Sequence, residues 1–233
     1  MEIVLDSRMK KIADCVRCGG VLADIGTDHG KLPIYLAQKG IVKRAVASDI
    51  NSMPLQRADN NIKKYGMQDR IDTFLTDGLR GVEDFGPTDV VIAGMGGELI
   101  EQILSASEKI ARCVKLILQP MTKEETLRKY LCENGYSITE EYIVRSGKLY
   151  QIICAEYTGK ITDMTQVELV LGKVNLAKKE ELLADLAERE IRKIEKVLAG
   201  KEKAGIDSDN ERKLLKDLLK VREDCYGNGK SAV

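Results

Sequence analysis

The sequence lacks an excess of either charge, and it lacks any long apolar run. Lysine plus arginine and aspartate plus glutamate each number 37 among the 233 residues, so the formal net charge is zero. This excludes the strongly basic composition that would by itself indicate nucleic-acid binding, and it leaves only local basic patches as candidates. No apolar segment approaches the roughly 18 residues of a membrane-spanning helix, so we expect none.

A targeting segment and a metal-binding pattern are also missing. The N-terminal stretch "MEIVLDSRMKK" has no basic region followed by an apolar one, so we expect no signal peptide and a cytoplasmic protein. The six cysteines are accordingly expected to be reduced thiols. Cys15 and Cys18 form a "CVRC" segment, but a structural zinc site needs a second pair of this kind. We therefore expect no metal. We also expect no obligate protein partner.

Aromatic and histidine side chains are scarce. The chain has no tryptophan, two phenylalanines and eight tyrosines, and His29 is its one histidine. Few rings are therefore available to stack on nucleic-acid bases. The histidine lies in "DIGTDHGKLPIYL", residues 24–36, beside two carboxylates and two glycines. This segment either binds a ligand or forms an ordinary strand-to-helix turn.

Strand and helix patterns alternate through the first part of the chain. Apolar runs bounded by glycine or polar residues predict strands over residues 19–26, 44–50, 70–77, 88–94 and 114–120. Helical spacing predicts helices over about residues 7–16, 32–38, 52–66, 98–107 and 122–135. Repeated alternation of this kind predicts a doubly wound α/β fold with a parallel sheet. The segment "SITEEYIVRSGKLYQIICAEY" turns at Ser146 and Gly147, which adds an antiparallel hairpin at the end of the sheet.

Two helix starts carry capping signals. Asp6 or Ser7 precedes the first helical pattern and is a candidate N-cap. The segment "TKEE", which begins at Thr122, has the spacing of a capping box for the last helix of the sheet region.

The composition changes after about residue 160. Apolar residues recur at helical spacing in "LADLAEREIRKIEKVL" and again in "ERKLLKDLLKVRE", within a dense mixture of lysine, glutamate and arginine. A polar, glycine-bearing connector separates the two segments, and Ser208 with Glu211 forms a second possible capping box. We predict an antiparallel, coiled-coil-like helix pair with solvated charged faces. The chain accordingly divides into residues 1–159 and residues 160–233.

The glycine loop does not fit a dinucleotide. The fingerprint for NAD or FAD requires glycine at the first, third and sixth loop positions, which here hold Gly26, Asp28 and Lys31. A carboxylate at the second of these positions would repel a pyrophosphate. The P-loop pattern is absent as well.

A cationic nucleoside ligand fits better. S-adenosylmethionine carries a sulfonium and an ammonium group and has no phosphate, so carboxylates at the carboxyl ends of the strands would attract it. Asp24 or Asp28 would contact the ammonium group, Asp49 would accept both ribose hydroxyls, and Asp77 with the backbone of Gly78 would contact the adenine. Each aspartate taken alone is more often a cap or turn residue. The residues expected to bind this cofactor are Asp24, Ile25, Gly26, Thr27, Asp28, His29, Asp49, Ile50, Asp77, Gly78, Ala93, Gly94 and Met95.

Several segments resemble one known family. "DIGTDHGKLP", "SDI", "DGL", "IAGMGG" and "LILQP" are similar, in order and spacing, to segments of the bacterial tRNA adenine-N1 methyltransferases that modify adenosine 22. The resemblance covers about residues 3–157, with Thr27 in place of the usual serine, and the family also carries a helical extension. It implies a class I, Rossmann-like methyltransferase fold, S-adenosylmethionine as cofactor and tRNA as partner.

The acceptor chemistry is consistent with a ring nitrogen. The Asn/Asp-Pro-Pro-aromatic tetrad that serves exocyclic amines is replaced by residues 93–97, and no Pro-Cys pair follows. Adenine N1 has a free lone pair at neutral pH and needs alignment more than a base. Glycines 94, 96 and 97 would leave room for the base. We assign Asp28 as the catalytic residue that orients the adenine amino group and stabilises the cationic product. For His29, scaffolding of the cofactor pocket is favoured over proton transfer.

A local basic patch would have to hold the tRNA. The candidates for RNA binding are Arg8, Lys10, Lys11 and Lys31, and Arg17, Lys43 and Arg44 lie nearby in sequence. Each of these residues can equally be a solubilising surface charge. Two other functions remain open, namely a methyltransferase for a small molecule and a non-catalytic binding module with this fold.

Overall fold

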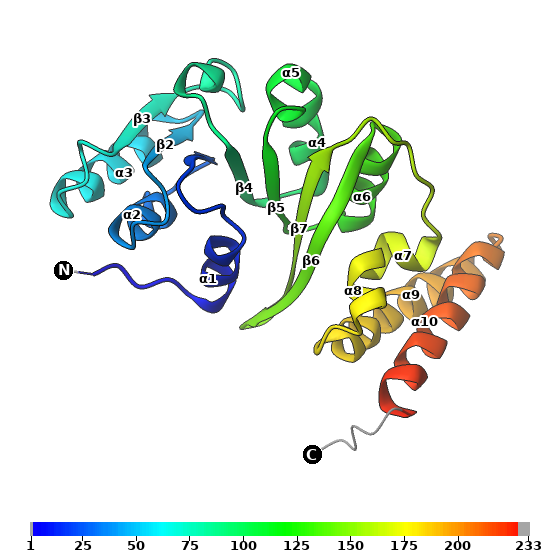
Figure 1. The fold of residues 1–233 in the computed structure, drawn as a ribbon. Coiled ribbons are helices and arrows are strands. Elements are labelled where there is room, and N and C mark those ends of the chain that lie inside the picture. Colours follow the sequence, from blue (N-terminus) through cyan, green and yellow to red (C-terminus); the bar gives the residue numbers. More distant parts are fainter. Residues whose placement is uncertain (1, 228–233) are drawn as a thin grey trace.

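A seven-stranded sheet lies at the centre of the structure, a computed structural model that describes residues 2–227 (Figure 1). The strands are β1 (Val21–Ile25), β2 (Arg44–Asp49), β3 (Ile71–Leu75), β4 (Asp89–Met95), β5 (Lys115–Pro120), β6 (Tyr136–Ser146) and β7 (Lys148–Tyr157). Their order is β3-β2-β1-β4-β5-β7-β6; β1 to β5 are parallel, and β7 is antiparallel to both of its neighbours. The predicted doubly wound α/β fold and its terminal hairpin are confirmed.

Helices cover both faces of the sheet. They are α1 (Ser7–Asp14), α2 (Lys31–Gln38), α3 (Ser52–Lys64), α4 (Gly97–Ser105), α5 (Glu108–Ala111) and α6 (Glu124–Glu133), with a short 3₁₀ helix, η1 (Val82–Phe85). Ile12 of α1, Ile34 of α2 and Ile62 of α3 belong to one buried cluster. Ile100 of α4 and Leu127 of α6 belong to the other. The central strands are buried between these two layers, which is why β1, β4 and β5 are nearly continuous apolar runs.

The two predicted helix caps have different outcomes. Asp6 caps α1, because its carboxylate accepts a hydrogen bond from Met9 N at 2.8 Å. The capping box predicted at Thr122 is wrong: α6 begins after Lys123, which has a φ of +59° and makes no side-chain capping bond. Thr122 instead offers its carbonyl to Gly97 N at 2.8 Å, so this turn holds the start of α4.

Residues 160–227 contain four helices. They are α7 (Gln166–Leu171), α8 (Lys173–Lys178), α9 (Leu183–Ala204) and α10 (Asp209–Gly227). A capping box that we did not predict, Thr165 with Glu168, begins α7. In the second predicted box, Ser208 Oγ accepts from Arg212 Nε at 3.1 Å and Glu211 Oε1 accepts from Lys201 Nζ at 2.7 Å.

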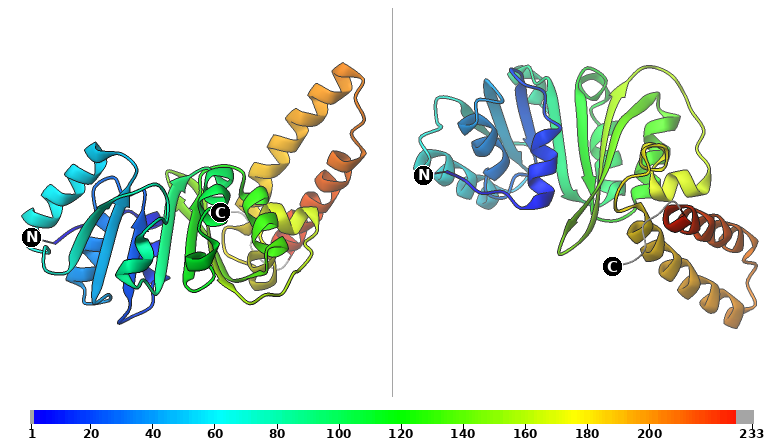
Figure 2. Two further views of the ribbon diagram at one scale, coloured as in Figure 1. Left: turned by 90° about the horizontal axis from the view of Figure 1, so that it is seen from above. Right: turned by 60° about the horizontal axis from the view of Figure 1, so that its bottom comes forward.

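The predicted helix pair projects from the hairpin end of the sheet. Figure 2 shows α9 and α10 side by side, leaving the sheet as an antiparallel pair. Their contact begins at a buried cluster that includes Leu186 and Ile191 of α9 and Leu218 of α10. Ile143 and Leu149 of the hairpin belong to the same cluster. The division at residue 160, between β7 and α7, therefore remains a prediction, since apolar packing continues across it.

A buried ionic network joins the hairpin to the extension. Arg128 Nε lies 2.7 Å from Glu141 Oε1, and both side chains are fully buried. The guanidinium also donates to Gln151 Oε1 at 2.7 Å and to the Leu169 carbonyl at 2.8 Å. Glu141 Oε2 accepts from Val174 N at 2.8 Å. One ion pair thus satisfies backbone groups of α7 and α8 and fixes them against β6, β7 and α6.

Replacing Arg128 should destabilise the protein strongly. In Arg128→Met, Glu141 becomes a buried carboxylate without its cation, which costs about 3–5 kcal/mol. Urea denaturation should show this loss in the free energy of unfolding. The control is Arg145→Met, because Arg145 pairs with Asp185 at 3.1 Å with both side chains half exposed, and such pairs contribute about 0–1 kcal/mol. Equal losses in the two variants would contradict this account of the network.

Candidate functional site

The loops after β1, β2, β3 and β4 meet at one edge of the sheet, called the carboxyl edge below. Strand order places β1 beside both β2 and β4, with Ile25 opposite Ser48 and Ile92. The chain changes direction across the sheet between β1 and β4, and ligands of doubly wound folds bind at such a point. The predicted cofactor residues after all four strands are therefore brought to a common edge.

Asp24 is the buried acid of this edge. Its side chain lies near the end of β1, with 8% of the residue exposed. Burial raises the pKa of Asp24 to about 6, and a hydrogen bond with the Thr27 side chain opposes that rise. Thr27 Oγ1 also accepts from Gly30 N at 3.2 Å, which closes the loop. Among the described residues no cation pairs with Asp24, so the site holds a carboxylate that favours a positively charged ligand.

The loop after β1 packs closely against its neighbours. The backbone N–H groups of Gly26 and Thr27 donate to the Ser48 carbonyl at 2.8 and 2.9 Å. Gly26 has a φ of +74°, and a Cβ there would collide with the methyl end of Met95. Glycine is therefore favoured here by the left-handed backbone, and the flexible end of the Met95 side chain occupies the space beside it.

Asp28 and His29 lie at the surface of the same loop. Asp28 Oδ2 is 3.0 Å from His29 Nε2, and Asp28 Oδ1 is 3.6 Å from Arg57 Nη1 of α3. The His29 carbonyl accepts from Asn61 Nδ2 at 3.0 Å. Residue 29 thus helps to tie the loop to α3 through its backbone, while its imidazole contacts the carboxylate proposed as catalytic.

The acids after β2 and β3 occupy different environments. Asp49 is partly buried, and its Oδ1 accepts from Asn51 N at 2.7 Å, which shapes the turn into α3. Its neighbour Ile50 is 61% exposed and is available to an apolar ligand surface. Asp77 is exposed, and Gly78 lies against Ile103 with a φ of +64°.

The glycines after β4 have separate structural causes. The β4–β5 register shifts between Ala93 and Met95, and Gly94 is exposed there with a φ of +84°. Gly97 is buried, and a Cβ on it would collide with the Lys123 carbonyl. The prediction that Gly97 leaves room for a base is therefore wrong, because the α6 turn requires that glycine.

The predicted basic residues separate into two groups. Arg8 belongs to the first group: it lies beside Gly94 at the carboxyl edge and donates to Gln119 Oε1. Lys10 and Lys31 are exposed. Arg17 lies at the opposite edge, where it pairs with Asp89 at the start of β4 at 3.1 Å. Arg44 likewise begins β2 at that opposite edge. The suggestion that Arg17, Lys43 and Arg44 share the basic patch is thus wrong.

Gln119 is a polar residue of the site that sequence reasoning missed. It is fully buried near the end of β5, and its Nε2 donates to the Pro120 carbonyl at 2.6 Å. A glutamine that interrupts the apolar run "KLILQP" was the available signal, since buried polar side chains need specific partners.

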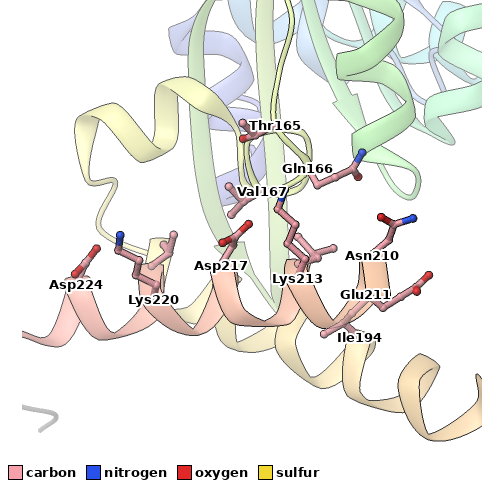
Figure 3. A pocket seen from close by; sticks show the side chains of 12 residues that line it. Thr165, Gln166, Val167, Ile194, Asn210, Glu211, Lys213, Asp217, Lys220 and Asp224 are labelled. Atoms are coloured by element: carbon pink, nitrogen blue, oxygen red, sulfur yellow. The ribbon is translucent and has the colours of Figure 1, made fainter. Parts of the chain in front are cut away.

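Other features of the described residues do not indicate a further functional site. No cluster of three metal-ligating side chains and no helix long and apolar enough to cross a membrane occurs among residues 2–227. A groove of about 760 Å³ lies between the start of α7 and the face of α10 that points toward it (Figure 3). Lys213 and Lys220 line it together with Glu211, Asp217 and Asp224, so it has no basic character.

The fold and the acidic carboxyl edge define the class of Rossmann-like methyltransferases. The methyltransferase domain family matches residues 5–153. The Bacillus subtilis (strain 168) tRNA (adenine(22)-N(1))-methyltransferase is 34% identical over 157 residues, and the match spans 66% of each chain. The chain belongs to the methyltransferase domain family and, within it, to the TrmK-like tRNA adenine-22 N1-methyltransferase family.

Solved structures agree over almost the whole chain. The crystal structure of the B. subtilis m1A22 tRNA methyltransferase TrmK is similar with a TM-score of 0.80 and 26% identity, covering 97% of this chain and 99% of that one. Streptococcus pneumoniae Sp1610 in complex with S-adenosyl-L-methionine is similar with a TM-score of 0.80 and 29% identity, covering 94% and 97%. The predicted resemblance is thus confirmed, and a relative binds the predicted cofactor.

The pKa of Asp24 predicts a pH-dependent gain in stability for Asp24→Asn. A carboxyl whose pKa rises from 3.8 to about 6 on folding binds its proton more tightly in the folded state. The stability of the native protein therefore falls as pH rises from about 4 to about 6, and the full penalty is present above that range. Asparagine has no such penalty, so the variant should be more stable by about 2–3 kcal/mol near pH 7 and equally stable below pH 4.

Urea denaturation at both pH values measures this difference. Asp28→Asn is the matched control, since the Asp28 side chain is 64% exposed in the same loop. The same gain in both variants would show that burial of Asp24 is not its cause.

Proposed function

We propose that this protein transfers a methyl group from S-adenosylmethionine to N1 of adenosine 22 in tRNA. The observation that carries the proposal is the buried Asp24 carboxylate, without a described cationic partner, at the point where β1 and β4 separate. A cationic cofactor would neutralise this carboxylate, whereas a pyrophosphate would be repelled. The similarity to the B. subtilis enzyme supports the choice of acceptor.

The cofactor would follow the carboxyl edge from β1 to β3. Asp24 would bind the ammonium group across the Gly26 loop, and Asp49 would accept hydrogen bonds from the ribose through the carboxylate oxygen that Asn51 N does not use. Asp77 and Gly78 would contact the adenine, with the exposed side chain of Ile50 against its face. When bound, S-adenosylmethionine supplies an electrophilic methyl group on a positively charged sulfur.

The protein's contribution to the reaction is chiefly alignment. Adenine N1 is nucleophilic without deprotonation, so holding it in line with the methyl group supplies much of the rate. Gly94 is exposed at the β4 bulge, where a flat base meets no side chain from that residue. Flipping the adenosine out of the folded tRNA would precede the transfer.

Asp28 is proposed to stabilise the cationic product. Its carboxylate lies at the surface in an ion pair with Arg57 that is 3.6 Å long, and both side chains are more than half exposed. Its 3.0 Å contact with His29 Nε2 also lies at the surface. Exposed pairs contribute about 0–1 kcal/mol each, so Asp28 can turn toward the acceptor at little cost. Arg8, Lys10, Lys11 and Lys31 are proposed to contact the RNA.

Methylation of defined tRNA transcripts tests the function. With labelled S-adenosylmethionine and an unmodified transcript, digestion should yield 1-methyladenosine, and a transcript with guanosine at position 22 should remain unlabelled. A methylated small molecule with unlabelled RNA, or no turnover at all, would contradict the proposal.

Asp49→Ala tests the cofactor assignment by a separate measurement of binding. Loss of its charge-assisted hydrogen bonds should weaken cofactor binding about tenfold or more, as measured by calorimetry. Asp59→Ala is the control, because Asp59 pairs with Lys63 on the exposed part of α3 and should leave the affinity unchanged. Equal effects of the two substitutions would remove Asp49 from the site.

A further inference from the structure

Two tyrosines of the hairpin each contact two cationic side chains. The Tyr150 ring centre is 5.2 Å from the Arg8 guanidinium carbon and 5.2 Å from Lys148 Nζ. The Tyr142 ring centre is 4.7 Å from Lys11 Nζ and 4.9 Å from Lys178 Nζ. We call these six residues the hairpin stripe: Arg8, Lys11, Tyr142, Lys148, Tyr150 and Lys178.

The two rings lie on one face of the hairpin. Tyr150 is directly opposite Val144, and Tyr142 is directly opposite Ile152, so all four side chains project from the same side. Both α1 and α8 contact β6, and Figure 1 shows the hairpin reaching between them. The stripe therefore runs from the extension, at Lys178, across the hairpin to α1, at Arg8.

One end of the stripe reaches the proposed site of methyl transfer. Arg8 donates to the buried Gln119, and a Cβ on Gly94 would lie only 3.8 Å from Arg8 Nη1. Gln119 cannot turn away freely, because its amide nitrogen is bonded to the Pro120 carbonyl. Gln119 is thus a positioning residue that holds the guanidinium beside the β4 bulge.

The positive charge of the stripe is mostly uncompensated. Arg8, Lys148 and Lys178 form no ion pair with a carboxylate of the described residues. Lys11 has a long pair with Asp14 at 3.8 Å. Glu140 accepts from the Tyr142 hydroxyl at 2.6 Å and pairs with Lys115 Nζ at 3.0 Å. Together with the Tyr142 hydrogen bond, the charges of Lys115 and Lys178 help to lower the pKa of Glu140, so this one acid lies near two cations.

The combination of cations and rings is suited to nucleic acid. Two like charges on one ring repel each other, and an anion between or beside them relieves that repulsion. Grooves that follow a nucleic-acid backbone combine positive charge with aromatic rings. In the stripe the rings hold the cations, and the cations are the groups that would meet phosphate. Each of the two half-buried tyrosine rings lies near two cations, which distinguishes the stripe from isolated surface lysines.

The chemistry of the product selects phosphate over the base as the ligand of Arg8. Methylation at N1 places a positive charge on adenine, and a guanidinium bonded to that ring would oppose it. A phosphate beside the flipped nucleotide carries the opposite charge and matches the N–H geometry of arginine.

We propose that the hairpin stripe binds the RNA phosphates flanking the acceptor adenosine. Arg8 holds the phosphate nearest the base, and Lys148, Lys11 and Lys178 follow the backbone toward the extension. This inference rests on the proposed tRNA substrate, and it specifies how a chain of zero net charge binds a polyanion.

The test compares Arg8→Gln and the double variant Lys148→Gln/Lys178→Gln with the wild type. Affinity for an unmodified tRNA transcript is measured by fluorescence anisotropy between about 50 and 200 mM salt. Each phosphate contact that is lost should reduce the slope of log affinity against log salt by about one. Arg8→Gln should also weaken tRNA binding about tenfold and raise the KM for tRNA, with an unchanged dissociation constant for S-adenosylmethionine.

Lys64→Gln is the matched control. Lys64 also lies over a tyrosine, at 5.9 Å from the Tyr65 ring centre, but at the end of α3 away from the stripe. It should keep the wild-type slope and KM. Thermal melting of each variant identifies any loss of folding, which would lower cofactor affinity but would not change the salt slope selectively.

The outcomes separate this inference from the proposed function. If both stripe variants keep the wild-type salt slope while the wild type still methylates tRNA, the stripe does not bind phosphate and the proposed function is unaffected. A wild-type protein that neither binds nor methylates tRNA would overturn both. Reduced slopes in the stripe variants alone would establish the phosphate contacts.

Discussion

The burial of the Asp24 carboxylate follows from its position in the parallel sheet. The acid near the end of β1 lies between Ala47 of β2 and Val91 of β4 in the parallel sheet, and only 8% of the residue is exposed. Its charge is unfavourable until a cation arrives, and the raised pKa reflects that cost. The end of the Met95 side chain lies beside Gly26, so the end of β4 packs against the loop after β1. In the proposed function, a positively charged cofactor would relieve this cost at Asp24.

A second charged region with the opposite sign lies next to this edge. Carboxylates follow β1, β2 and β3, whereas Arg8 and the hairpin cations lie beyond β4 and β5. This separation suits a reaction between a cationic donor and a polyanionic acceptor, since each ligand is attracted to its own side. Zero net charge is therefore compatible with tRNA binding, because the local field and not the total charge acts on a nearby phosphate.

The extension is held to the hairpin by a buried ion pair. Arg128 and Glu141 together satisfy backbone groups of α7 and α8, and Gly172 approaches so closely that a Cβ there would lie 2.6 Å from the Glu141 carboxylate. Such a network tolerates few alternative arrangements, because each misplaced partner leaves a buried polar group unsatisfied. Lys178, which follows this junction in α8, is thereby held over Tyr142.

Sequence alone determined the order of strands and helices, the terminal hairpin and the acids at the strand ends, because hydrophobic periodicity and turn residues are local properties. It also predicted a helix pair after residue 160. It did not predict α7 and α8, because each has only six residues and shows too few turns for a helical pattern. Tertiary structure decided what distant residues do together. The β4–α4 turn packs closely against the turn before α6. Because of this packing, Thr122 does not form the predicted capping box, and residue 97 must be glycine. Helix α1 runs from one edge of the sheet to the other, so Arg8 and Arg17, nine residues apart, lie at opposite edges. Contacts such as those of Arg8 with Gln119, or of Tyr142 with Lys178, join segments far apart in the chain, and no local pattern encodes them.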